Sequence, residues 1–466
     1  MIEEVWYTRF DILERRIIRL KDAIEAEMNF SRAQTLSTFV TRLREFADFH
    51  FKFFFNGFNN GSLEKSDQYP PHHVIYVILE QISFDLEALS WAIDQRRAKA
   101  ARDEQRMSEA LEIADKLSLQ ALQPAIERFN LDNLNVITYF QKFPEIRMIP
   151  YANIALIGIP YTCVALPFSG AQLVYEDYLA IPHEVAHYVY WHGAIEGKPL
   201  RQYLTEKLAG LLDWGEEWFE EVFADVYGCL IAGPVIAKIF QDLQLRFNRE
   251  QFVYDDSEHP VPILRPHIYT KVLRKRFAMK WAQKLNQRWL DERSTIANNY
   301  SFKHKKSGES KSIADALSMV DSCDDEMIHP DSDKPLDIMI NTILQVIGQV
   351  DSLKWWHGYL SGSSPNFYKR FGNHFKKHQE DNFKELDIPT EYVKFCEPQE
   401  LHSSWLNTGW DELRETLIME QDSSEKADEE INKYKIQNKI PEKVWLKVFQ
   451  AGGWATKGPD DNPTSG

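Results

Sequence analysis

Two histidines four positions apart, His183 and His187, place the strongest constraint on this chain, and Glu184 follows the first of them directly. On an α-helix with about 3.6 residues per turn, positions i and i+4 lie on one face, so both imidazoles can reach one point. That spacing suits a tetrahedral Zn²⁺ ion about 2.0–2.1 Å from each nitrogen. Glu184 would stand beside the ion, where its carboxylate can accept a proton from bound water. The motif therefore predicts a zinc-binding helix.

The residues around this motif are apolar on nearly every side of the expected helix. Leu179, Ala180 and Ile181 precede it, and the run from Tyr188 to Trp191 follows it. A helix that is apolar all round is buried, and burying two histidines with a glutamate is costly unless they have partners. The alternative is a pair of hydrogen-bonded core histidines that flank a glutamate by chance. The buried setting favours a functional site.

A second motif, from Glu221 to Asp225, lies downstream in another predicted helix and places these two acids on one face. Together the two motifs resemble those of the gluzincins, the thermolysin-like clan of zincin metallopeptidases. The resemblance covers about residues 130–240, and it implies that Zn²⁺ binds His183, His187 and Glu221. It also implies that Asp225 accepts a hydrogen bond from a ligating histidine. Such a ligand set leaves the fourth zinc position open for water, and the aspartate fixes the histidine's tautomer and orientation.

Two other glutamates on this helix compete with Glu221 for the ligand role. Glu217 lies one turn earlier on the same face, but the residue four positions after it is Glu221 rather than an aspartate. Glu220 is predicted to point elsewhere, and Ala224 follows it at the same spacing. The pairing with Asp225 therefore selects Glu221.

The proline-rich stretch from Ser257 to Tyr269 offers candidates for a further catalytic role. Many gluzincins stabilise the oxyanion of the tetrahedral intermediate with a His, Tyr or Arg from beyond the third ligand. Residues of suitable chemistry here are His259, Arg265, His267 and Tyr269. Of these, His267 and Tyr269 are the favoured catalytic candidates. The alternative is a proline-braced connection whose Arg and His side chains pair with surface carboxylates.

Hydrophobic periodicity predicts a predominantly helical α+β fold, in which a zincin-like catalytic core with a small sheet and the active-site helix is flanked by helical regions. Helices are expected over about residues 5–55, 74–126, 169–192, 200–212, 216–240, 336–356 and 410–448. Pro182 should kink or restart the helix that carries the first motif. Strands are expected at 135–140, 154–159 and 164–166. The second strand is interpreted either as an edge strand that binds extended substrate or as a central strand.

Composition along the chain also predicts how it is organised into regions. The stretch rich in Ser, Lys and Asp near residue 300 is typical of an exposed loop, and the Gly- and Pro-containing end has little means of packing. The expected regions are an N-terminal helical region (1–130), a zincin-like metallopeptidase core (131–297), a linker or exposed loop (298–335), a C-terminal helical region (336–450) and a flexible tail (451–466).

The composition of the chain limits the classes of partner that it is expected to bind. The formal net charge of −16 argues against a nucleic-acid binder, because a phosphate backbone attracts clustered Lys and Arg. No apolar stretch approaches the roughly 18 residues of a membrane span, and the first residues are acidic where a secretory signal would be basic. The 4 cysteines are scattered and form no CxxC pair, which favours a cytoplasmic location.

These features favour a zinc metalloendopeptidase that acts on a protein or peptide substrate, with Glu184 as general base. Two alternatives stay open. One is an aminopeptidase or another zinc amide hydrolase, although no motif that would capture a free amine is evident. The other is a non-catalytic helical scaffold that retains a metallopeptidase-like core. A cytoplasmic peptidase must also be restrained, and a regulatory protein partner is one expected means.

Overall fold

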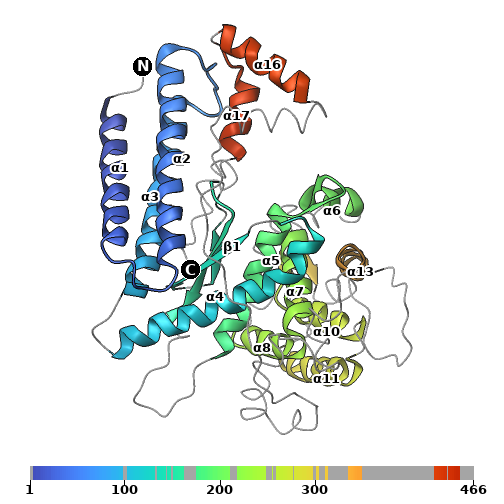
Figure 1. The fold of residues 1–466 in the computed structure, drawn as a ribbon. Helices are drawn as coiled ribbons and strands as arrows, with labels where there is room; N and C mark the ends of the chain where they lie inside the picture. The colour runs from blue at the N-terminus through green and yellow to red at the C-terminus, as the bar shows by residue number, and fades with distance from the viewer. Residues whose placement is uncertain are drawn as a thin grey trace. The chain divides into compact units, whose positions relative to one another are not determined.

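The computed structural model describes residues 4–97, 102–131, 134–142, 144–147, 149, 151–161, 175–209, 218–247, 254, 259–275, 278–296, 301–303, 310–312, 334–348, 424–437 and 439–451. The fold is α+β and predominantly helical, as the sequence predicts (Figure 1). The chain divides into two compact units. One comprises residues 1–111, 147–156 and 399–466, and the other comprises residues 112–146 and 157–398.

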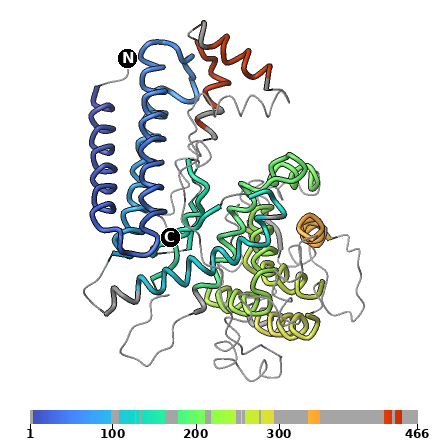
Figure 2. The backbone as a smooth tube through the Cα atoms, in the orientation of Figure 1, coloured from blue at the N-terminus to red at the C-terminus, as the bar shows by residue number. Residues whose placement is uncertain are grey.

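The first unit is built on three helices that pack against one another (Figure 2): α1 (Glu4–Glu25), α2 (Ala33–Asn60) and α3 (Pro71–Arg97). Helix α1 buries Phe10, Ile17 and Ile24, which recur at seven-residue steps and so lie on one face. The range predicted to be helical, residues 5–55, is helical on both sides of a break between Glu25 and Ala33. Arg32, just before α2, adopts a left-handed backbone conformation with φ 64°, which an α-helix cannot contain.

Two C-terminal helices, α16 (Ser424–Gln437) and α17 (Glu442–Ala451), belong to the same unit. Leu63 and Ile440 form an isolated parallel bridge, and the indole Nε1 of Trp445 donates a 2.8 Å hydrogen bond to the carbonyl of Glu64. These contacts join segments from opposite ends of the sequence.

A small sheet contains β1 (Asn135–Gln141), β2 (Glu145–Arg147) and β3 (Ile154–Pro160) in the order β1-β3-β2. Among the described strands β3 is therefore central, and its interpretation as a cleft-edge strand is wrong. The short β2 was not predicted, because three residues carry too little pattern. The strand expected at residues 164–166 lies outside the described residues.

The second unit contains the helix α4 from Glu112 onward (the whole helix is Arg102–Arg128) and a cluster of further helices around α7. These are η2 (Tyr175–Ala180), α5 (Ile181–His192), α6 (Leu200–Leu208), α7 (Phe219–Ala232), α8 (Pro234–Gln244), α10 (Arg265–Lys275), α11 (Met279–Ile296) and α13 (Pro335–Ile347). Helix α7 is buried along almost its whole length and packs against α5, α10, α13 and α8. The expected helix over 216–240 is divided at Gly233, whose φ is 62°, and at Pro234, which begins α8.

Two short hairpins complete the described elements. Strands β4 (Ala194–Ile195) and β5 (Lys198–Pro199) follow α5, and β6 (Ser301–Lys303) pairs with β7 (Ser310–Ser312) inside the range expected to be a loop. None of the helices in the described part of the chain combines the length and apolar character needed to cross a bilayer.

Candidate metal centre

Helices α5 and α7 pack closely against each other, and Gly228 on α7 faces the backbone of His183. A Cβ atom at Gly228 would lie 3.5 Å from the backbone N of His183 and 3.6 Å from its Cα. These are ordinary van der Waals distances, so alanine would fit against His183 and only a side chain longer than alanine would push the two helices apart. Pro182 lies in the first turn of α5, where its missing N–H leaves no hydrogen bond unmade. The first turn of α5, which carries His183, is thus held against the middle of α7.

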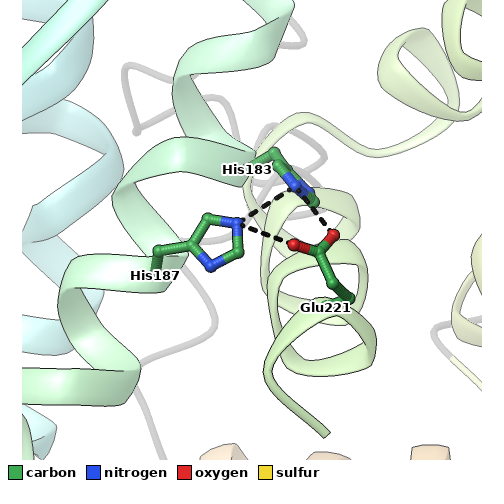
Figure 3. A group of neighbouring side chains, drawn as sticks. All are labelled: His183, His187 and Glu221. Atoms are coloured by element: carbon green, nitrogen blue, oxygen red, sulfur yellow. Dashed lines mark hydrogen bonds and ion pairs between the residues drawn. The ribbon is translucent and has the colours of Figure 1, made fainter. Parts of the chain in front are cut away.

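The side chains of His183, His187 and Glu221 converge between these two helices (Figure 3). The Nε2 atoms of the two histidines are 3.3 Å apart. Each lies 3.4 Å from one Glu221 oxygen, His183 from Oε2 and His187 from Oε1. Neighbouring ligand atoms on a tetrahedral zinc, with bonds of about 2.0–2.1 Å, lie about 3.3–3.4 Å apart. The spacing and the donor types therefore fit a group that could hold a metal ion.

A carboxylate stands behind each histidine on the side away from this group. Asp225 is fully buried, and its Oδ1 lies 3.1 Å from Nδ1 of His183. Oε1 of Glu220 lies 2.8 Å from Nδ1 of His187. The prediction that Glu220 points away from the site is therefore wrong. The i, i+4 spacing of Glu221 and Asp225 gave a signal for Asp225, whereas the contact of Glu220 depends on how α5 crosses the start of α7.

Arg265, the first residue of α10, is a further component of the site. Its Nη2 lies 3.1 Å from Oε2 of Glu221 and 2.8 Å from Oδ1 of Asp225, and its Nε donates to Oδ2 of Asp225 at 2.9 Å. Its guanidinium also lies over the ring of Phe240, with 4.7 Å to the centroid. The alternative prediction, that Arg265 pairs with surface carboxylates, is therefore wrong, because both of its carboxylate partners are buried.

The other three candidates from this stretch, His259, His267 and Tyr269, differ in how deeply they are buried. The hydroxyl of Tyr269, only 1% exposed, donates a 2.9 Å hydrogen bond to Oδ1 of Asp225. His267 is buried on the same helix, α10. Nε2 of His259, whose side chain is 39% exposed, lies 3.3 Å from Oε1 of Glu221. Glu217 lies outside the described residues. The stretch therefore contributes Arg265 and His259 directly to Glu221, and Tyr269 indirectly through Asp225.

The neighbouring carboxylates control the protonation of the two histidines. Burial alone would lower the pKa of His183, but hydrogen bonds to Asp225 and Glu221 and the charges of both acids raise it to about 10. For His187, burial again lowers the pKa, while the charge of Glu221 and the hydrogen bond to Glu220 raise it overall. The ring of His183 thus favours the protonated state at neutral pH, and the pKa of His187 is shifted in the same direction.

The affinity for a metal ion is therefore expected to rise with pH across the range from about 6.5, the ordinary pKa of histidine, to about 10, the pKa of His183. A metal ion can bind these rings only after their protons leave, so the affinity should rise about tenfold per pH unit for each proton displaced. Competition titrations against a chromophoric chelator at several pH values, corrected for the chelator's own protonation, would measure the slope. A flat profile would contradict the involvement of His183.

Glu184 lies beside the group without belonging to it. Its pKa is raised by burial, while the charges of His183 and His187 oppose this rise and those of Glu221 and Glu145 add to it. A raised pKa makes a carboxylate a stronger base, which suits proton transfer near neutral pH. The group and its neighbour can therefore combine cation binding with acid–base chemistry.

Comparison with protein-family models, curated proteins and solved structures found no match to this chain. The assignment of a function to the chain therefore depends on the chemistry of its own residues.

Proposed function

We propose that this protein is a zinc-dependent metalloendopeptidase. The observation that carries the proposal is the convergence of His183, His187 and Glu221 at tetrahedral spacing, with Glu184 next to them on α5. Three protein ligands leave one position for water, as in catalytic rather than structural zinc sites. The resemblance of both motifs to those of gluzincins supports peptide hydrolysis over other zinc-dependent reactions.

His183, His187 and Glu221 would hold the ion, which would act as a Lewis acid on water and on the scissile carbonyl. Glu184 takes a proton from the attacking water and later delivers it to the leaving amine, so the peptide bond is replaced by a carboxylate and an amine. Glu220 accepts a hydrogen bond from Nδ1 of His187, and Asp225 lies 3.1 Å from Nδ1 of His183, so both carboxylates would keep Nε2 of the histidines directed at the ion.

The oxyanion donor is a separate proposal. His267 and Tyr269 are the residues favoured by the sequence, and the hydroxyl of Tyr269 is engaged by Asp225. His259 is a second candidate, because it lies beside Glu221 and is partly exposed. Comparing kcat for Tyr269→Phe with kcat for His259→Gln and His267→Gln would identify the donor.

Metal removal tests the proposed function. The full-length protein is expected to carry about one zinc per chain and to cleave fluorogenic peptides blocked at both ends. Dialysis against a chelator should abolish cleavage, and stoichiometric zinc should restore it. Cleavage confined to peptides with a free amino terminus would instead show an aminopeptidase. Bound zinc without cleavage of any peptide in a broad library would support a non-catalytic scaffold.

A further inference from the structure

The imidazole of His187 lies between carboxylates from two consecutive residues of α7. Oε1 of Glu220 is 2.8 Å from Nδ1, and Oε1 of Glu221 is 3.4 Å from Nε2. A carboxylate that accepts a hydrogen bond from Nδ1 leaves the lone pair of a neutral ring on Nε2. Glu220 therefore selects the tautomer in which His187 presents a metal-binding nitrogen to Glu221 and His183.

Glu220 is itself held in place by a second donor. The indole Nε1 of Trp191 donates to the same Oε1 atom at 2.8 Å. Trp191 follows His187 by four positions on α5, so one carboxylate oxygen connects two successive turns of that helix to α7. The guanidinium of Arg201 lies over the indole ring, 4.1 Å from its centroid. Two side chains of α5 therefore hold the Glu220 carboxylate in place by hydrogen bonds.

A purely structural explanation is available for an acid at this position. Glu220 lies in the first turn of α7, where a negative charge interacts favourably with the helix dipole. That interaction needs only a charge near the helix end, whereas orientation of His187 needs an acceptor at the site of Oε1. The two roles therefore predict different behaviour for Glu220→Gln and Glu220→Ala.

We propose that Glu220 is a positioning residue that, together with Trp191, fixes the orientation and tautomer of His187 for zinc binding. This proposal rests on the proposed function only in requiring that zinc occupies the group. Each ligand histidine then has its own carboxylate, Asp225 for His183 and Glu220 for His187. Asp225 is fully buried, whereas the side chain of Glu220 is 30% exposed, so substitutions at position 220 should be compatible with folding.

The test compares the zinc affinity of Glu220→Ala, Glu220→Gln and Trp191→Phe by chelator competition. Loss of a carboxylate behind a ligating histidine typically weakens metal binding by about 10–100-fold, and Glu220→Ala is expected in that range. Glu220→Gln keeps an oxygen that can accept both hydrogen bonds, and it should recover most of the affinity. Trp191→Phe should lose less than Glu220→Ala.

Glu206→Gln and Glu206→Ala are matched controls, since Glu206 is an exposed glutamate of the same unit that pairs with Lys198 at 2.8 Å. Both should bind zinc like the wild type. Wild-type affinity in Glu220→Ala, or an equal loss in Glu220→Gln and Glu220→Ala, would overturn the positioning role. Failure of the wild type itself to bind zinc would overturn the proposed function, and this proposal with it.

Discussion

Glu184→Gln is expected to lower the rate of peptide hydrolysis by about 10²–10⁴-fold, the usual contribution of a general base, while leaving zinc bound. The amide keeps the size of the carboxylate but cannot accept a proton from water. Glu184 is next to His183 in α5 but is not part of the His183, His187 and Glu221 group. This variant should therefore lose catalytic rate while it keeps its affinity for the metal ion.

Single-turnover cleavage of a blocked peptide, with zinc content measured on the same sample, would test this separation. Glu206→Gln supplies a matched control, because it makes the same chemical change at an exposed ion pair. Full activity in a zinc-loaded Glu184→Gln protein would assign the base to another residue. Loss of zinc together with activity would instead indicate that Glu184 serves the metal site rather than the reaction.

Arg265→Met is expected to lower the local stability of α7 and α10 in the metal-free protein by about 3–5 kcal/mol, the typical effect of breaking a buried ion pair. The change removes the arginine that Glu221 and Asp225 share and leaves His183 as the positive group that contacts both acids. Burial alone would raise the pKa of Asp225, but the charge of Arg265, followed by contacts with His183, lowers it overall. Asp225 is therefore ionised at neutral pH, and in this variant it loses the nearer of its two positive partners, Arg265 at 2.8 Å rather than His183 at 3.1 Å.

The pH dependence of this effect has a defined sign. A carboxyl with a lowered pKa in the folded protein contributes stability above its unfolded pKa of about 3.9 and loses it as pH falls through the folded value. The difference between wild type and Arg265→Met should thus be fully developed at neutral pH and should narrow below about pH 4. Hydrogen exchange of α7 and α10 amides at several pH values would measure it.

Lys271→Met is the matched comparison for Arg265→Met. Lys271 lies on the same helix and pairs with buried Asp337 at 3.0 Å. It should also destabilise the protein, because it too leaves a buried carboxylate without its cation. Unlike Arg265→Met, it should leave zinc affinity unchanged, since neither Lys271 nor Asp337 belongs to the candidate site. Equal stability of wild type and Arg265→Met at neutral pH would contradict the role assigned to Arg265.

Sequence patterns predicted the helices well and their ends less well. Apolar spacing identifies a buried face at Phe10, Ile17 and Ile24, because that spacing reflects the turn of the helix itself. The break before α2 depends on the left-handed backbone conformation of one residue, Arg32. An arginine side chain gives no sequence signal for that conformation. At Gly233 and Pro234 a breaking signal was present, but the apolar pattern on both sides outweighed it.

Some contacts of the candidate site could likewise be predicted from the sequence, and others could not. The grouping of His183, His187 and Glu221 could be predicted because each spacing lies within one helix, and the resemblance to gluzincins connects the two helices. The contacts of Glu220 and Arg265 depend on the angle and offset at which α5, α7 and α10 pack. The residue spacing within one helix does not specify the angle or offset at which it packs against another helix. These contacts could therefore be identified only in the tertiary structure.

The missing side chain at Gly228 can serve to recognise other proteins of this kind. A chain could carry both ligand motifs and still be unable to bring its helices together, if a bulky residue faced the backbone of the first histidine. The distinguishing signature is therefore longer than the ligands alone. It begins with Glu220 and Glu221, continues with Asp225, and ends three positions later with Gly228. Screening genomes for HExxH followed by EExxxDxx and then Gly or Ala would retrieve candidates selected for helix packing as well as for metal ligands.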